Sequence, residues 1–288
     1  MRLPWQARVV VRHSMRRTAA TRPVASDEVS GIRIVTWNVN KRADLRPHVA
    51  FLTSLEPDVV VLQEVKLTRI GELRRALLEG GWSAVVSSVD AVGPARLDHA
   101  VVVASGGSLD EQARPRVPWP ESAVSVLVRL AEGAVKVTGA HVPTASPHRD
   151  VKVRTIKALV EHAASGRVAH QVLCGDMNTP RAEFEDGTII TFGQTQRRDG
   201  SFGVPPRLRD LDAAERSLFR DLPAYGVTDA FRSLHGFAER ASSWRRFRLD
   251  HTFVSTGLAP ITCRYHHDVV DQGLSDHAAM ETELERTT

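Results

Sequence analysis

The sequence predicts an α/β or layered α+β domain, and two observations support this. From Gly31 onward, runs of β-branched residues alternate with segments whose apolar residues recur at helical spacing. The chain also contains no internal repeat, no low-complexity linker and no second composition regime. We therefore expect one domain over residues 30–288, although a chain of 288 residues could form two.

The first half of this domain is expected to be mostly sheet. Its first helix ends at Glu56-Pro57, because a residue before proline is disfavoured in the helical conformation. Gly133 lies in a short turn that joins two strands. The elements predicted here are strand 32–37, helix 42–55, strand 58–62, helix 67–78 and strands 82–89, 100–104, 124–130 and 135–140.

The second half is expected to begin with a helix and to return to sheet. A short strand leads directly into the polar segment Gly175-Asp176-Met177-Asn178, and an irregular stretch follows to about Pro206. The elements predicted here are helix 149–164, strand 171–174, helix 212–222 and strands 243–247, 251–254, 261–266 and 278–284.

Composition excludes several classes of protein. The chain is 42% hydrophobic and 25% charged, and no run approaches the roughly 20 apolar residues that span a bilayer. We therefore expect no membrane insertion. Only two cysteines occur, Cys174 and Cys263, which is too few for a disulfide framework. A reducing, cytoplasmic location is expected.

The net charge of +4 comes from the N-terminal residues. Six arginines precede Asp27, the first acidic residue, and the rest of the chain holds 32 basic residues against 34 acidic ones. We expect residues 1–29 to form a basic, disordered arm. The arm is open to three interpretations: a tether for phosphates, a targeting sequence, or a long translation start with Met15 as the true start.

Polar side chains gather where the predicted strands begin or end. Each of these clusters alone has a structural explanation, such as a turn, a helix cap or a buried histidine with satisfied hydrogen bonds. Six of them at strand ends are harder to explain in that way. They are Trp37-Asn38-Val39-Asn40, Leu62-Gln63-Glu64, Gly139-Ala140-His141, Gly175-Asp176-Met177-Asn178, Arg248-Leu249-Asp250-His251 and Leu274-Ser275-Asp276-His277.

These clusters combine groups that hydrolytic chemistry requires. Oxygen donors such as Glu64 and the Asn38 amide are ligands that Mg²⁺ or Mn²⁺ accepts. A carboxylate such as Asp176 can accept a proton from an attacking water. His277 can contact a phosphoryl oxygen if Asp250 fixes its tautomer.

Together the motifs resemble the endonuclease/exonuclease/phosphatase superfamily, which includes deoxyribonuclease I and exonuclease III. Three segments are similar to the exonuclease III and apurinic (AP) endonuclease branch: Leu62-Gln63-Glu64-Val65-Lys66, Gly175-Asp176-Met177-Asn178 and Tyr225-Gly226-Val227-Thr228-Asp229-Ala230-Phe231-Arg232. The resemblance runs from about Ile32 to Leu284. It implies a four-layer sandwich of the DNase I-like type, in which two packed mixed β-sheets are flanked by helices.

The resemblance also implies a role for each matching residue. Metal-binding roles fall to the oxygen donors Glu64, Asn38 and Asp276, with Mg²⁺ or Mn²⁺ as the cofactor. Catalytic roles fall to Asp176 and Asn178 for the water, His277 held by Asp250 for the transition state, and His141 for the leaving oxygen. Substrate contacts are expected from Asn40, Trp244 and Arg248.

Three functions remain open on the sequence alone. The first is a metal-dependent phosphodiesterase that acts as a nuclease on nucleic acid, with a monomeric chain. The second is a phosphatase or phosphodiesterase that acts on a small-molecule or lipid phosphoester, which suits the near-neutral body of the chain. The third is a binding module that has kept the fold. The segment from Trp244 to Asp250 is much shorter than in the exonuclease III branch, so abasic-site specificity is not implied.

Overall fold

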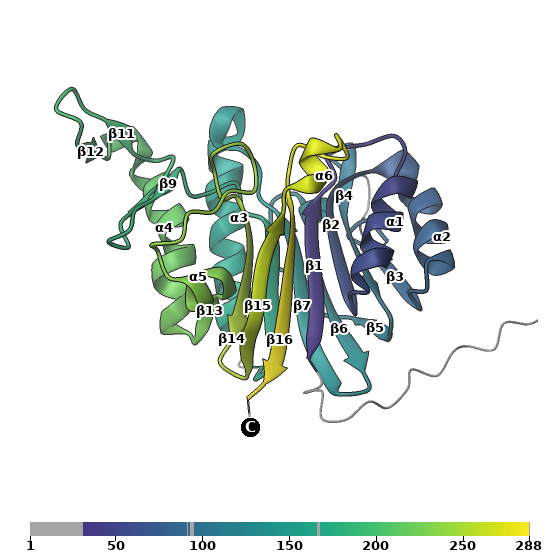
Figure 1. Ribbon diagram of the computed structural model, residues 1–288. Coiled ribbons are helices and arrows are strands. Elements are labelled where there is room, and N and C mark those ends of the chain that lie inside the picture. Colours follow the sequence, from purple (N-terminus) through teal and green to yellow (C-terminus); the bar gives the residue numbers. More distant parts are fainter. Residues whose placement is uncertain (1–30, 91, 93–94, 166–167, 288) are drawn as a thin grey trace, which may run out of the picture.

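The computed structural model describes residues 31–90, 92, 95–165 and 168–287. Two six-stranded mixed sheets form its centre (Figure 1). In spatial order the first sheet contains β15 (Leu258–His266), β16 (Ala279–Arg286), β1 (Ile32–Asn38), β2 (Val59–Lys66), β4 (His99–Ser105) and β3 (Ala84–Ser87). The second contains β13 (Val227–Asp229), β14 (Asp250–Ser255), β8 (Gln171–Asp176), β7 (Gly133–His141), β6 (Ala123–Leu130) and β5 (Ser108–Glu111).

Four helices complete the layers, and two short ones lie near the sheet ends. They are α1 (Arg46–Leu55), α2 (Ile70–Glu79), α3 (Ala145–Ser165), α4 (Arg209–Ala224), α5 (Ala230–His235) and α6 (Asp268–Asp271). Leu52 of α1 and Leu73 of α2 pack with strand residues of the first sheet, whereas Leu159 of α3 and Leu218 of α4 pack with strand residues of the second. The predicted four-layer sandwich is confirmed.

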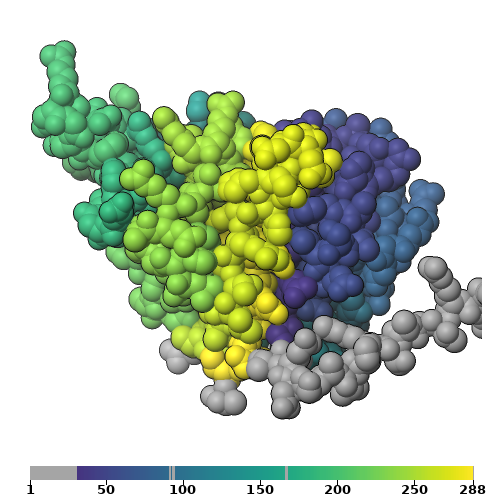
Figure 2. All heavy atoms as spheres, viewed as in Figure 1, coloured from purple at the N-terminus to yellow at the C-terminus, as the bar shows by residue number. Residues whose placement is uncertain are grey.

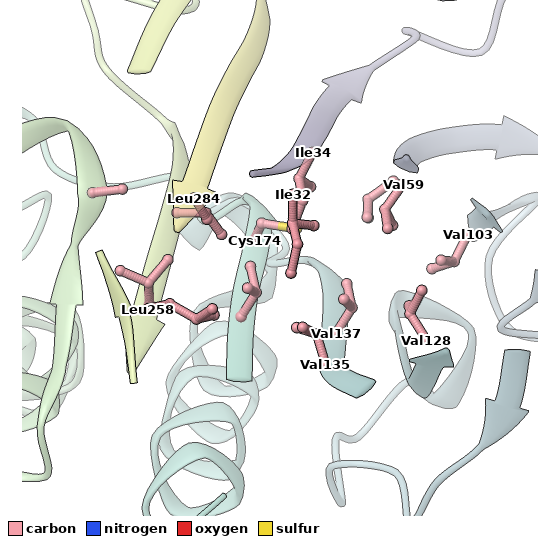
Figure 3. Close-up of a cluster of buried hydrophobic side chains, with 14 of the residues drawn as sticks. Ile32, Ile34, Val59, Val103, Val128, Val135, Val137, Cys174, Leu258 and Leu284 are labelled. Carbon is pink, nitrogen blue, oxygen red and sulfur yellow. The ribbon is translucent and has the colours of Figure 1, made fainter. Parts of the chain in front are cut away.

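The alternation of side chains along β1 explains why the sheets pack in this way. Ile32 and Ile34 enter the core between the two sheets (Figure 3). Val35 and Trp37 face the layer of α1 and α2 instead. Successive strand residues point to opposite faces, so a strand buried on both sides needs an almost continuous apolar run. A shift of the pairing register of β1 by one residue would move every side chain to the opposite face of the sheet, so burial on both faces fixes this register.

Two pairs of parallel strands bring the polar strand ends together. β1 pairs with β2 and places Asn38 opposite Gln63, while β7 pairs with β8 and places His141 opposite Asp176. Parallel strands end at the same edge of a sheet. Antiparallel β14 enters at that edge, with Asp250 opposite Asp176. The candidate site residues therefore meet at one end of the sandwich.

Most of the predicted elements are found. The strands predicted at 58–62 and 171–174 run on to Lys66 and Asp176. In α3, Ser146 and His148 have non-helical dihedrals, in agreement with a helix from residue 149. The strand predicted at 243–247 is wrong, because Trp244 and Phe247 close a tight turn instead. The predicted arm, 1–29, lies outside the described residues.

The irregular stretch before α4 forms two small hairpins. They pair β9 (Ala182–Glu183) with β10 (Ile189–Ile190), and β11 (Thr195–Gln196) with β12 (Phe202–Gly203). This segment projects from the body of the molecule as a teal-green lobe (Figure 2). Among the described residues, none of the helices combines the length and apolar character needed to cross a membrane.

Candidate active site

Asn38 lies between two carboxylates at the end of the sandwich. Its Nδ2 donates to Glu64 Oε1 at 3.2 Å and to Asp176 Oδ2 at 3.0 Å. The Asn38 Oδ1 accepts the Asn40 N–H at 2.9 Å. The Asn38 amide group therefore holds the two carboxylates toward a common point, and Asn40 fixes the orientation of that amide.

Glu64 reaches this point because β2 is irregular there. The register between β2 and β4 shifts between Leu62 and Val65, and Glu64 has a φ of 56°. A bulge of this kind turns a side chain away from the regular alternation of the strand. The 3₁₀ turn that follows has no side-chain cap, so Glu64 does not act as a helix cap.

His277 and Asp250 form a buried, hydrogen-bonded pair. His277 Nδ1 lies 2.7 Å from Asp250 Oδ2, and His277 Nε2 lies 3.9 Å from Asp176 Oδ2. Burial alone would lower the pKa of His277, but the adjacent Asp250 carboxylate outweighs it and raises that pKa to about 10. The pKa of Asp250 is lowered, because its interactions with His277 outweigh the effect of its burial. His277 therefore faces Asp176 as a cation.

Ser275 and Trp37 hold the loop that carries His277. Ser275 Oγ donates to the Asn38 carbonyl oxygen at 2.6 Å, and Trp37 Nε1 donates to the His277 carbonyl oxygen at 2.9 Å. These two bonds join the end of β1 to the start of β16. They set the position of the imidazole relative to the carboxylates.

His141 completes the group from the end of β7. Its Nε2 lies 3.4 Å from Glu64 Oε1 and 3.8 Å from Asp176 Oδ2. Its buried Nδ1 has no hydrogen-bond partner among the described residues. His141 is thus not a core histidine with all its hydrogen bonds satisfied. Burial lowers its pKa to about 4, so the imidazole is neutral at neutral pH.

Asn178 sits beside Asp176 in a tight turn. Its backbone N–H donates to Asp176 Oδ1 at 2.8 Å, and its Nδ2 donates to the Val142 carbonyl oxygen at 2.8 Å. The residue has a φ of 51°, a left-handed conformation that asparagine tolerates better than most residues. The predicted pair of Asp176 and Asn178 is therefore held as one unit.

The donor set fits a divalent cation. Burial, and then the neighbouring Asp250 carboxylate, raise the pKa of Asp176 to about 7. The positive charge of His277 therefore does not fully offset the negative charge around this point. Glu64 faces the same point and offers the hard oxygens that Mg²⁺ prefers. Glu64 is thus the carboxylate that would hold the ion.

Other combinations of residues are less suitable for the ion. Ligand atoms of Asp176, Asp250 and His277 all lie within 4.8 Å of one another. A protonated histidine that is hydrogen-bonded to a carboxylate has no lone pair for a metal, which argues against this trio. Asp276, which was also expected to bind the metal, is exposed, and its Oδ2 accepts the indole N–H of Trp244 at 2.8 Å.

Trp244 lies next to the buried histidine. Its ring centroid is 6.2 Å from that of His277, and it stacks on Phe247 at 5.9 Å. The exposed guanidinium groups of Arg245 and Arg246 lie over the rings of Trp244 and Phe247, at 4.4 Å and 5.1 Å. Neither arginine has an acidic partner within the described part of the chain.

The expected contact between Arg248 and substrate is wrong. The residue is 2% exposed, and its guanidinium binds Glu183 at 2.7 and 2.8 Å and Asp229 at 2.8 Å. Arg232 also binds Glu183, at 2.9 Å. Because its guanidinium is buried and paired, Arg248 stabilises the fold and is not available to a phosphate.

Replacing Glu183 by glutamine should produce a pH-dependent loss of stability. Burial would raise the pKa of Glu183 from 4.5, but Arg248 and Arg232 outweigh it and lower the pKa to about 2. The carboxylate therefore stabilises the fold above pH 4.5 and loses this effect as the pH falls toward 2. At pH 7 we expect the free energy of unfolding to fall by about 3–5 kcal/mol.

Urea unfolding at pH 7, 4.5 and 3 measures this effect. The difference between wild type and Glu183→Gln should shrink as the pH falls. Exposed Glu185→Gln is the matched control and should leave stability unchanged at each pH. A difference for Glu183→Gln that stays constant over this range would show that the ion pairs are not responsible.

Comparisons with known proteins agree with this architecture. A family model described as "Endonuclease/Exonuclease/phosphatase family" matches residues 35–277. Comparison with curated protein sequences gave no match. Solved structures do match, at identities that indicate a shared fold.

Three of these structures illustrate the likeness. The 3′ phosphatase NExo from Neisseria, bound to a product DNA hairpin, is 22% identical, with a TM-score of 0.66 over 88% of this chain and 99% of that chain. An AP endonuclease from Archaeoglobus fulgidus is 18% identical, with a TM-score of 0.63 over 87% and 98%. An endonuclease/exonuclease/phosphatase from Beutenbergia cavernae is 17% identical, with a TM-score of 0.63 over 89% and 72%.

Proposed function

Because the chain belongs to the endonuclease/exonuclease/phosphatase family of metal-dependent phosphoesterases, we propose that it hydrolyses phosphodiester bonds in nucleic acid. The observation that carries this proposal is the row of rings beside His277. Trp244 and Phe247 offer faces on which bases can stack, and Arg245 and Arg246, which have no acidic partner among the described residues, are cations for phosphates. The similar Neisseria structure, which is bound to a DNA hairpin, supports the same class of substrate.

The buried groups suit in-line attack of water on phosphorus. Asp176 accepts a proton from the water, and Asn178 beside it orients the water. His277, charged and fixed by Asp250, stabilises the negative charge that develops on a phosphoryl oxygen. Neutral His141 can donate an N–H hydrogen bond to the leaving oxygen. When bound at Glu64, Mg²⁺ would supply charge neutralisation of the phosphoryl group.

A small-molecule or lipid phosphoester is the second candidate. Without the six arginines that precede Asp27, the chain has 32 basic and 34 acidic residues, so its body carries no general attraction for a polyanion. The chemistry of the buried groups is the same for either substrate. What distinguishes the two is the contribution of the half-buried rings of Trp244 and Phe247 to binding.

A panel of substrates tests this proposal. Hydrolysis with Mg²⁺ is measured on plasmid DNA, an abasic-site duplex, single-stranded RNA and a soluble phosphoester. For the nucleic acid that is cleaved, Trp244→Ala should raise KM by roughly 5- to 100-fold, as the loss of one stacked base predicts. It should leave KM for the small phosphoester unchanged. Turnover of the small phosphoester alone, with no nucleic acid cleaved, would favour the second candidate.

A further inference from the structure

A buried ion pair lies directly behind the Asn178 turn. Lys152 of α3 binds Glu215 of α4, and their side chains are 1% and 0% exposed. Lys152 Nζ also donates to the carbonyl oxygen of Asn178 at 2.7 Å. A lysine with this little exposure must find partners for its charge within the protein, and one of the partners here is the backbone of a proposed catalytic residue.

The same pair holds a second segment near the site. Glu215 Oε2 accepts the backbone N–H of Phe192 at 2.6 Å, and the Phe192 ring lies 5.0 Å from Lys152 Nζ. The Phe192 ring lies in turn 5.7 Å from that of Phe247. One buried pair thus connects the Asn178 turn to the aromatic residues beside His277.

Stability alone is a weak reason for such a pair. Two charges removed from water recover little net free energy by pairing, and apolar residues of similar volume often serve a fold equally well. A side chain without a donor at position 152 would, however, leave the Asn178 carbonyl oxygen without this bond. That carbonyl belongs to a residue with a φ of 51°, and among the described residues the bond from Lys152 is the one that fixes this carbonyl, whereas the other bonds of the turn hold the Asn178 N–H, the Asn178 side chain and the neighbouring residues.

We infer that Lys152 is a positioning residue: by binding the Asn178 carbonyl oxygen, and with Glu215 to hold it there, it keeps Asn178 beside Asp176. This inference rests on the proposed function, because it assigns Lys152 a role in the same hydrolysis. A displacement of about 1 Å in a group that orients a reactant can cost roughly 100-fold in rate.

The experiment compares three variants with the wild-type protein. In Lys152→Met we expect kcat to fall by about 100-fold, with KM changed by less than about threefold. Lys152→Arg, which keeps a donor and a charge, should recover most of the kcat. Leu159→Ala opens a cavity elsewhere on α3 and is the control for lost stability. It should lower the melting temperature while leaving kcat within about twofold of wild type.

A double-mutant cycle separates positioning from a general structural effect. If Lys152 acts through Asn178, adding Lys152→Met to Asn178→Ala should lower kcat little further. Full additivity of the two losses would overturn the inference. So would a kcat for Lys152→Met no lower than that of Leu159→Ala at matched folded fraction.

Hydrogen exchange gives a readout that does not depend on activity. In Lys152→Met, the backbone amides of residues 176–179 should exchange faster than in Leu159→Ala of equal stability. If the wild type hydrolyses nothing, the proposed function fails and this exchange result alone decides whether Lys152 orders the Asn178 turn. If amide protection in Lys152→Met were unchanged, the inference about Lys152 would be overturned. This would hold even if the wild type is active and loses that activity in His277→Ala, so that the proposed function stands.

Discussion

Replacing His277 by alanine is expected to lower kcat for phosphodiester hydrolysis by about 10³-fold, with a much smaller change in KM. The imidazole is buried, hydrogen-bonded to Asp250 at 2.7 Å and directed at Asp176 from 3.9 Å. A group held in this way contributes mainly when charge develops on the phosphoryl oxygens. Initial rates over a range of substrate concentrations at saturating Mg²⁺ give both constants.

Two variants show whether this loss is specific. Asp250→Asn keeps the shape of the pair but removes the charge that holds His277 protonated, so it should also lower kcat strongly. His266→Ala removes a histidine that is hydrogen-bonded to Glu281 at 2.7 Å and should leave kcat unchanged. Wild-type kcat in His277→Ala would exclude this histidine from the chemistry.

Replacing Glu64 by glutamine should raise the Mg²⁺ concentration needed for half-maximal activity by roughly 10- to 100-fold. Glu64 is placed by the bulge in β2 so that its carboxylate faces Asp176 across the Asn38 amide. Glutamine keeps the shape and one oxygen but loses the negative charge that attracts the cation. A titration of activity against Mg²⁺, after removal of metal with a chelator, measures the midpoint.

The matched control for this titration is Glu72→Gln. Glu72 is exposed on α2, where it pairs with Arg69 at 3.0 Å, so its titration should overlay that of the wild type. If Glu64→Gln shifted the midpoint by less than about twofold, Glu64 would not be a metal ligand.

Much of the fold follows from the chain because the pattern that predicts each strand is local. The segment from Ile32 to Trp37 is mostly apolar, interrupted only by Arg33 and Thr36, because β1 is buried on both faces. The ends of the strands could be predicted equally well, because polar clusters interrupt the apolar runs there. What brought Asn38, Glu64, His141 and Asp176 together was the parallel pairing of two strand pairs, which a single sequence does not specify.

The residues that the sequence analysis misjudged or missed have a different physical origin, because their positions depend on partners that are distant in sequence. Arg248 was expected to contact substrate, but it meets Glu183, 65 residues earlier. The sequence places Lys152 on the apolar face of its helix, because buried Ile156 and buried Leu159 follow it by four and seven residues. That position was a signal of burial, although it did not identify Glu215 as the partner.

Hydrolysis in water enriched with ¹⁸O is the measurement that tests the central claim most directly. An oligonucleotide that the wild type cleaves in Mg²⁺ is digested, and the products are analysed by mass spectrometry. Water attack on phosphorus predicts one ¹⁸O atom in the product that carries the phosphate, no product after the metal is chelated, and about 10³-fold slower product formation in His277→Ala. Cleavage without ¹⁸O in the phosphate, or cleavage at the wild-type rate in the chelator or in His277→Ala, would contradict the account.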